Sequence, residues 1–266
     1  MAKKIVLLKN RTTPVDQYHD IFESNDYNPQ FLPLLKHSPL NKPEILQFLK
    51  SEEYINDYQA LIVTSQRCIE VLDDLVHTLQ EEKFEHIDTL LSKPSYTVGP
   101  TTAHFLAKLG FKDIRGGKDA GNGMILSDII VNDPLFTNSN NKKILFLTGE
   151  IRRDIIPKRL KSENYQLLEL VSYRTEPLDN IYERYIEAHN SMVEEDDNWV
   201  VFFSPQGTEE IIQYMKKSKR FFKLASIGPT TEEYLLKEGL TPHIVARKPD
   251  ATSLFDSILN LSKSQE

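Results

Sequence analysis

Short, continuously apolar runs alternate with longer amphipathic stretches along the chain. Continuous apolar runs are typical of parallel strands covered by helices on both faces, because neither side of such a strand meets water. The predicted strands are residues 5–8, 60–63, 96–98, 144–147, 167–171, 200–203 and 224–227. Glu169 and Ser226 are the polar exceptions. The pattern therefore predicts an α/β fold built on parallel sheets.

The stretches between the strands carry apolar residues at helical spacing. The predicted helices are residues 69–79, 101–109, 124–131, 154–161, 180–189, 208–217, 231–238 and 253–262. Gly110 and Gly239 directly follow two of them, where helix C-terminal glycines belong. Residues 132–141 are rich in Asn and contain Asp-Pro, which predicts a loop.

The chain contains an internal repeat. Lys3-Lys-Ile-Val-Leu-Leu8 returns as Lys142-Lys-Ile-Leu-Phe-Leu147, 139 positions later, and Leu61-Ile-Val-Thr-Ser65 returns at the same offset as Val200-Val-Phe-Phe-Ser204. Val98-Gly-Pro-Thr-Thr102 returns as Ile227-Gly-Pro-Thr-Thr231. Three matches in the same order indicate a duplicated α/β unit.

Length and composition agree with a globular protein. At about 150 residues per domain, 266 residues allow two modest domains or one large one. Mean hydropathy is −0.42, and no run approaches the roughly 18 apolar residues of a membrane helix. Residues 5–8 are too short an apolar run for a signal peptide, so we expect a first strand in a cytoplasmic protein that does not bind membranes.

Several common chemistries are disfavoured. The single cysteine, Cys68, excludes an internal disulfide and multi-cysteine metal sites, and a buried apolar role is expected for it. The seven histidines are not at metal-ligand spacing, so no metal site is expected. The net charge of −7 argues against nucleic-acid binding. A dinucleotide-dependent enzyme is disfavoured because Gly121-Asn-Gly123 lacks the following glycine of the fingerprint.

Four strand-to-helix turns carry hydroxyl residues, two in each repeat. They contain Thr64-Ser65, Thr101-Thr102, Ser204 and Thr230-Thr231. Each hydroxyl alone could simply cap its helix. Four similar turns instead favour a shared anion site, because ligands bind at the carboxyl ends of parallel strands and helix N-termini offer free N–H groups.

Other residues add to this candidate site. Gly99 and Gly228 precede the prolines of the two Gly-Pro-Thr-Thr turns and allow a ligand to approach the backbone. Lys223 and the pair Arg152-Arg153 supply positive charge, and Gly207 lies in the turn after Ser204.

With these residues in view, the chain resembles the uroporphyrinogen-III synthase family. The resemblance is carried by six segments in the family's order: Leu61-Ile-Val-Thr-Ser-Gln-Arg67, Val98-Gly-Pro-Thr-Thr102, Thr148-Gly-Glu-Ile-Arg-Arg-Asp-Ile-Ile-Pro157, Val171-Ser-Tyr-Arg-Thr-Glu-Pro177, Val201-Phe-Phe-Ser-Pro205 and Ala225-Ser-Ile-Gly-Pro-Thr-Thr231. Each segment is weak alone, but together they span nearly the whole chain.

The resemblance implies two flavodoxin-like, parallel-sheet α/β domains joined by a two-stranded linker, with a cleft between them. The expected discontinuous domain is 1–36 plus 174–266, and the inserted domain is 40–170. The linker strands are expected near 31–39 and 168–177. The domain boundary would then differ from the repeat junction near residue 140.

The family's activity is that of a cyclizing hydro-lyase. It implies loss of the hydroxyl from ring A of hydroxymethylbilane, a spiro intermediate, and closure with ring D inverted to give uroporphyrinogen III for haem biosynthesis. The resemblance implies no cofactor, a small-molecule substrate with eight carboxylates, and a monomer.

The resemblance also implies residue roles. Tyr173 is expected to donate a proton to the leaving hydroxyl, since a phenol is protonated at neutral pH. Thr230 is the second expected catalytic residue, and it either binds a substrate carboxylate or orients the leaving group. The expected substrate-binding residues are Thr64, Ser65, Arg67, Gly99, Thr101, Thr102, Arg152, Ser204, Gly207, Lys223, Gly228 and Thr231. The alternative is a non-catalytic two-domain protein that binds an anionic metabolite.

Overall fold

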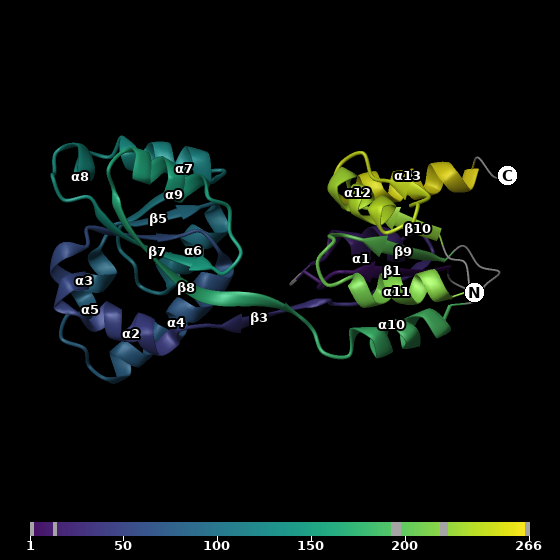
Figure 1. Cartoon of the computed structure of the whole chain (residues 1–266), viewed down its shortest axis with the longest axis horizontal. Coiled ribbons are helices and arrows are strands. Elements are labelled where there is room, and N and C mark those ends of the chain that lie inside the picture. The colour runs from purple at the N-terminus through teal and green to yellow at the C-terminus, as the bar shows by residue number, and fades with distance from the viewer. Residues whose placement is uncertain (1–2, 13–14, 193–197, 219–222, 264–266) are drawn as a thin grey trace. The chain divides into compact units, whose positions relative to one another are not determined.

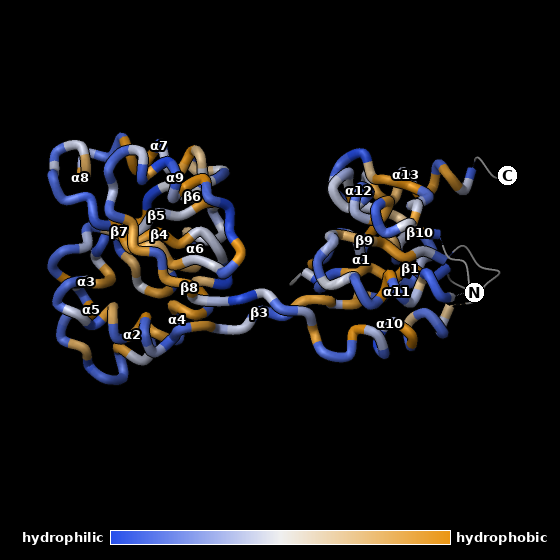
Figure 2. Tube along the Cα trace, viewed as in Figure 1, coloured by the Kyte–Doolittle hydropathy of each residue, from blue (hydrophilic) through white to orange (hydrophobic). Residues whose placement is uncertain are grey.

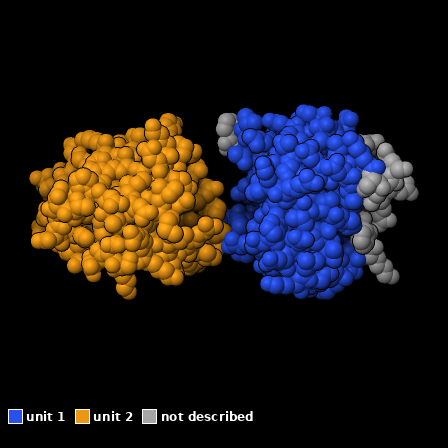
Figure 3. All heavy atoms as spheres, turned by 90° about the horizontal axis from the view of Figure 1, so that it is seen from above, with its two compact units in different colours: residues 1–36, 176–266 blue, residues 37–175 orange. Residues whose placement is uncertain are grey.

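The computed structural model describes residues 3–12, 15–192, 198–218 and 223–263. The chain forms two compact units (Figure 3). Unit 1 contains residues 1–36 and 176–266, and unit 2 contains residues 37–175. The two passages between the units lie within strand β3 (Leu35–Pro39) and strand β8 (Gln166–Pro177).

Unit 1 contains a five-stranded parallel sheet (Figure 1). Its strands are β1 (Lys3–Leu8), β2 (Tyr27–Phe31), β9 (Trp199–Phe202), β10 (Lys223–Ser226) and β11 (Ile244–Val245). The spatial order is β11-β10-β9-β1-β2, which is the doubly wound order of flavodoxin-like sheets. The strand order reverses between β1 and β9, where ligands bind in such folds.

Helices cover both faces of this sheet. They are α1 (Gln17–Glu23), α10 (Ile181–Asn190), α11 (Glu209–Lys217), α12 (Pro229–Lys237) and α13 (Ala251–Lys263). Buried residues of α10, α11 and α12 pack in one hydrophobic cluster, and those of α1 and α13 pack in another. The sheet is therefore shielded from water on both sides, as its apolar strands require.

Unit 2 contains a six-stranded sheet. Besides β3 and β8, its strands are β4 (Ala60–Val63), β5 (Ser95–Val98), β6 (Ile114–Gly117) and β7 (Lys143–Gly149). The order is β3-β8-β7-β4-β5-β6, and the strands from β8 to β6 are parallel. The Leu40 N–H donates to the Ser172 carbonyl and the Leu178 N–H donates to the Leu34 carbonyl, which makes the β3–β8 pair antiparallel.

Two groups of helices cover this second sheet. They are α2 (Lys42–Lys50), α3 (Glu52–Asp57), α4 (Gln66–Glu81), α5 (Ile87–Ser92), α6 (Pro100–Lys108), α7 (Gly123–Val131), α8 (Pro134–Thr137) and α9 (Ile155–Ser162). Buried residues of α2 to α6 form the core on one face, and those of α7 to α9 form the core on the other. The parallel α/β fold predicted from the sequence is confirmed.

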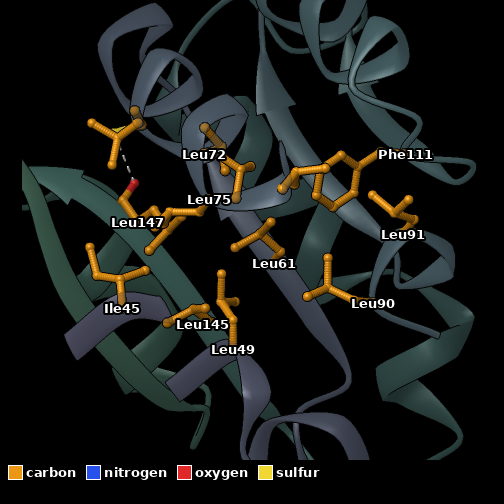
Figure 4. Close-up of a cluster of buried hydrophobic side chains, with 14 of the residues drawn as sticks. Ile45, Leu49, Leu61, Leu72, Leu75, Leu90, Leu91, Phe111, Leu145 and Leu147 are labelled. Carbon is orange, nitrogen blue, oxygen red and sulfur yellow. Dashed lines mark hydrogen bonds between the residues drawn. The ribbon is translucent and has the colours of Figure 1, made fainter. Parts of the chain in front are cut away.

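The larger core of unit 2 lies between the sheet and helices α2 and α4. Leu61, Leu145 and Leu147 of the strands pack there with Leu72 and Leu75 of α4 (Figure 4). All five side chains are at most 2% exposed, and burying each stabilises the fold by about 2 kcal/mol. In Figure 2, orange hydrophobic segments likewise lie along the strands inside each unit.

The repeated segments occupy equivalent positions in the two sheets. The sequence repeat relates β1 to β7, β9 to β4 and β10 to β5. Unit 1 has the order β11-β10-β9-β1-β2, and unit 2 has the matching order β6-β5-β4-β7-β8 before β3 is added. Each repeated strand therefore has equivalent neighbours, although the chain visits the positions in a circularly permuted order.

One predicted loop contains a helix. Residues 132–141 include α8. The Asp133 side chain caps this helix by accepting from the Leu135 N–H at 2.9 Å.

Within the described residues, no helix is long and apolar enough to cross a membrane.

Candidate functional site

A pocket of about 560 Å³ lies at the carboxyl ends of the strands of unit 2. Thr64 and Ser65 follow β4, and Thr148 and Gly149 end β7. These two strands are neighbours, and the strand order reverses between them. The pocket therefore occupies the position at which open α/β sheets bind ligands.

The pocket combines polar and apolar surfaces. Its polar lining residues are Thr64, Ser65, Asn122, Thr148, Arg152, Arg153 and Tyr173. Its apolar lining residues are Val98, Met124, Phe146, Ile151, Ile155 and Ile156. The described residues that line it include two arginines and no carboxylate, although Asp154 and Glu169 form ion pairs with Arg152. Ile151 is 72% exposed, so apolar surface is available at the pocket to an aromatic ligand.

Ser65 connects helix α4 to Tyr173. Its hydroxyl oxygen caps α4 by accepting from the Arg67 N–H at 3.2 Å. The same hydroxyl donates to the Tyr173 phenol oxygen at 3.2 Å. Ser65 is thus a helix cap and also a direct partner of the expected proton donor.

Arg152 enters the pocket from the segment between β7 and α9. Its guanidinium forms ion pairs with Asp154 and Glu169, and its side chain is 27% exposed. The two carboxylates hold the guanidinium in place while part of it faces the pocket.

Cys68 is fully buried in the core, which confirms the apolar role expected for it. Its thiol donates to the Leu147 carbonyl at 3.3 Å. Burial raises the pKa of this thiol to about 11, although hydrogen bonds to Ser172 and Ser65 act in the opposite direction. The thiol is therefore not a nucleophile at neutral pH.

The remaining candidates of unit 2 do not line the pocket. Gly99 is the N-cap of α6, with φ +79°, and no side chain caps that helix. Thr101 is exposed and Thr102 is buried in the first turn. Arg67 lies on α4, where its guanidinium contacts Glu70 at 2.6 Å.

In unit 1, the candidate turns lie on neighbouring strands. Ser204 follows β9 and Gly228 follows β10, and Phe202 pairs with Ser226 in the parallel register. Gly228 is the N-cap of α12 and no side chain caps this helix either. The backbone N–H groups of Thr230 and Thr231 are therefore free in helical geometry to bind an anion.

Gly207 lies three residues after Ser204 in the segment between β9 and α11, whereas Lys223 lies apart from these turns. A Cβ on Gly207 would lie 2.9 Å from Leu35 and 3.2 Å from Leu34, so packing and its φ of +78° explain this glycine. Lys223 begins β10, at the end of the strand opposite to Gly228, and its ammonium lies 5.6 Å from the centre of the Trp199 ring. Lys223 is therefore at the amino end of its strand, whereas Gly207 is in the segment that follows the carboxyl end of β9.

Two polar residues of the pocket were not predicted from the sequence. Thr148 directly follows the apolar run 144–147, which is the same signal that identified Thr64. Asn122 caps α7 by accepting from the Met124 and Ile125 N–H groups at 2.9 and 3.1 Å. An Asn before a helix is a recognised cap signal, but its place in the pocket depends on the fold.

A cation also lies in unit 1 near the point between β1 and β9 at which the strand order reverses. Lys9 follows β1, 139 positions before Thr148, and its ammonium contacts the Asp16 carboxylate at 2.5 Å. Burial of Asp16 opposes ionisation, but hydrogen bonds from Lys9 and the Thr12 N–H lower the pKa of this carboxyl. This ion pair is therefore present at neutral pH.

Fold and pocket together define a class: a two-unit, doubly wound α/β protein with a ligand pocket at the switch point of one sheet. The sequence pattern of the family described as uroporphyrinogen-III synthase HemD matches residues 16–256. The chain belongs to the uroporphyrinogen-III synthase family.

Individual relatives agree with this assignment. The chain is 43% identical over 265 residues to the uroporphyrinogen-III synthase of Saccharomyces cerevisiae, covering 96% of this chain and 95% of that protein. It is 34% identical over 260 residues to that of Schizosaccharomyces pombe, covering 97% and 96%. The family predicted from the sequence is confirmed, and the assignment as an enzyme is favoured over a non-catalytic binding protein.

Solved structures agree in fold. The uroporphyrinogen-III synthetase of Helicobacter pylori 26695 matches with a TM-score of 0.57 at 18% identity, covering 99% of this chain and 100% of that one. A mutant uroporphyrinogen III synthase of the extremely thermophilic bacterium Thermus thermophilus matches with a TM-score of 0.54 at 15% identity, covering 100% of both chains.

Proposed function

We propose that the chain converts hydroxymethylbilane to uroporphyrinogen III, and that the pocket of unit 2 holds the reacting part of the substrate. The observation that carries this proposal is a pocket with the Tyr173 phenol, two arginines, several hydroxyls and an apolar wall. Pyrrole rings that bear carboxylates need both kinds of surface. The apolar residues contact the rings, and the arginines and hydroxyls bind the carboxylates.

In the proposed reaction, the Tyr173 phenol donates its proton to the hydroxyl of ring A. As the carbon–oxygen bond breaks and water leaves, the nitrogen lone pair of ring A forms a carbon–nitrogen double bond, and ring A becomes an electrophilic azafulvene. The substituted carbon of ring D attacks this electrophile and forms a spiro intermediate. The intermediate fragments and recloses with ring D inverted, and the proton released on aromatisation can return to the phenolate. Proton donation of this kind contributes about 100-fold or more to a rate.

The rest of the site positions the substrate. We propose that Thr64, Ser65 and Arg152 bind carboxylates in unit 2, together with the free N–H groups of the Thr101-Thr102 turn. In unit 1 the Ser204, Gly228 and Thr231 turns bind further carboxylates, and Thr230 orients the leaving group. Holding a flexible bilane in one geometry removes much of the entropic barrier to the correct closure.

The experiment that tests these roles compares Tyr173→Phe and Thr230→Ala with the wild-type protein. Each variant is expected to reduce formation of the inverted isomer by about tenfold or more, while uninverted product from spontaneous closure increases. Tyr182→Phe is the matched control, because Tyr182 is an exposed residue on α10. Wild-type rates for both site variants would contradict the assignment.

A cytoplasmic location stays a prediction from the short N-terminal apolar run, and a monomeric state stays a prediction that follows from the resemblance. Sedimentation of the purified protein over a concentration series tests the monomer, and a concentration-dependent increase in mass would contradict it.

A further inference from the structure

Strand β8 contains a bulge where it leaves the pocket. Thr148 of β7 pairs with Val171, but the next residue, Gly149, pairs with Tyr173 and not with Ser172. One extra residue, Ser172, is thus inserted in β8. Such an insertion reverses the face on which every later side chain lies.

The reversal determines where the Tyr173 ring lies. Before the bulge, Leu168 and Leu170 pack on the core beside α4, whereas Leu167 packs on the core of the opposite face. Strict alternation would place residue 173 on the face of Leu167. Instead Tyr173 packs with Leu168 and Leu170, on the face of α4 and its cap Ser65.

Polar contacts hold the bulge. Ser172 is fully buried, its hydroxyl donates to the Thr148 carbonyl at 3.3 Å, and its carbonyl accepts from the Leu40 N–H at 2.8 Å. The Glu150 N–H donates to the Tyr173 carbonyl at 2.9 Å, so pairing resumes directly after the bulge. The buried carbonyl and hydroxyl of the inserted residue are therefore both satisfied.

Gly149 provides the space for the phenol. A Cβ at this position would lie 2.6 Å from Tyr173 Cζ, 2.7 Å from its hydroxyl oxygen and 2.9 Å from Cε1. These distances are far below van der Waals contact, and the atoms are those at the reacting end of the ring. Any side chain at residue 149 would therefore displace the phenol oxygen.

We propose that Gly149 and the Ser172 bulge are a positioning element for the reaction: the bulge directs Tyr173 to the face of Ser65, and the bare backbone of Gly149 sets the depth of its phenol in the pocket. Gly149 is then a positioning residue that acts through Tyr173. This inference rests on the proposed role of Tyr173 as proton donor.

The test is a double-mutant cycle in kcat and KM with hydroxymethylbilane, using wild type, Tyr173→Phe, Gly149→Ala and the double variant. Gly149→Ala is expected to lower kcat at least tenfold and to change KM less than twofold. In the Tyr173→Phe background the same substitution is expected to change kcat less than twofold, because the hydroxyl whose displacement lowers kcat is already absent, although Cζ and Cε1 of the ring still meet the added Cβ. A general structural defect would instead lower kcat by the same factor in both backgrounds, and that result would overturn the proposal.

Two outcomes separate this proposal from the one on which it rests. If Tyr173→Phe keeps the wild-type kcat, the proton-donor role fails. If Tyr173→Phe loses activity but Gly149→Ala does not, only the positioning role of Gly149 fails. Gly121→Ala is the matched control, because an added Cβ there meets no atom within 4 Å.

A second cycle covers the case in which Gly149→Ala does not fold. Ser65→Ala removes the hydroxyl that contacts the phenol, and Ser51→Ala removes an equivalent cap from α3, where the Ser51 oxygen accepts from the Tyr54 N–H at 3.1 Å. Both lose about 1 kcal/mol of helix capping. Only Ser65→Ala is expected to lower kcat, and only while Tyr173 is present. Equal kcat values for Ser65→Ala and Ser51→Ala would overturn the proposal.

Discussion

Gly228 offers a direct test of carboxylate binding at a helix N-terminus. Its backbone is extended, with φ 176° and ψ 177°, a conformation open to any residue. An added Cβ would meet no protein atom within 4 Å. The fold of the described residues therefore gives no reason for a glycine at this position. A ligand that approaches the N–H groups of Thr230 and Thr231 does give one, because a methyl group would stand in its way.

The expected effects of Gly228→Ala follow from this geometry. With no clash and no positive φ, the free energy of unfolding should change by about 0.5 kcal/mol or less. A carboxylate held off the helix end loses at least one charge-assisted hydrogen bond, worth about 1.5–3 kcal/mol. At about 1.4 kcal/mol per factor of ten, KM should rise by roughly 10- to 100-fold.

Steady-state kinetics with hydroxymethylbilane and thermal unfolding of the same samples measure both quantities. Gly239→Ala is the matched control at the other end of α12: Gly239 has φ +78° and an added Cβ also meets nothing within 4 Å. This control should lose about 1 kcal/mol of stability through backbone strain and keep the wild-type KM. A wild-type KM for Gly228→Ala would refute the proposed role of the α12 N-terminus.

Three further predictions concern other parts of unit 2. Asp133→Ala should lower the melting temperature by roughly 3–10 °C, since the carboxylate accepts from Arg115 at 2.7 Å and from the Tyr96 hydroxyl at 2.8 Å, and losing hydrogen bonds to a charged group costs about 1.5–3 kcal/mol. An unchanged melting temperature would count against the network. Partial desolvation and the positive charge of Arg67 lower the pKa of His37 below 6.5, so its contribution to stability is complete above about pH 6.5 and is lost as the pH falls below that value. In His37→Gln the melting temperature should therefore depend less on pH between about pH 7 and pH 5, and an identical pH profile would contradict this. Arg152→Gln should raise KM several-fold, and KM of the variant should depend less on salt concentration than KM of the wild type. The same salt dependence of KM in both proteins would exclude this guanidinium from carboxylate binding.

Strands covered on both faces were predictable from hydropathy, and those at sheet edges were not. Runs such as 60–63 and 144–147 match β4 and β7, which lie inside the sheet. The pattern missed β2, β3, β6 and β11, which are the four edge strands. An edge strand has one unpaired side and needs less apolar surface, and it tolerates proline, as Pro29 in β2 shows.

The helix ends followed from local chemistry. Gly239 has the positive φ expected after a helix, and its N–H donates to the Leu236 carbonyl at 3.0 Å. Among the missed helices, α3 and α8 span six and four residues, which is too few positions for a helical period to be recognised. The nine-residue helix α2 was missed as well.

The candidate site was predictable only in part. Thr64, Ser65, Arg152 and Tyr173 line one pocket. The first three lie in segments that follow strand ends in the sequence, whereas Tyr173 lies within strand β8 and was predicted from the family resemblance. Within unit 1, Lys223 lies away from the Gly228 turn, because a residue five positions before a turn lies at the opposite end of a short parallel strand. The orientation of Tyr173 also depends on a bulge in β8, and a one-residue change of register leaves no hydropathy signal.

Product analysis tests the central claim most directly. Purified protein is incubated with hydroxymethylbilane, and the porphyrin isomers are separated after oxidation. The proposed function predicts uroporphyrinogen III as the dominant product, formed faster than spontaneous closure. Only the uninverted isomer, formed at the rate of a protein-free control, would contradict it.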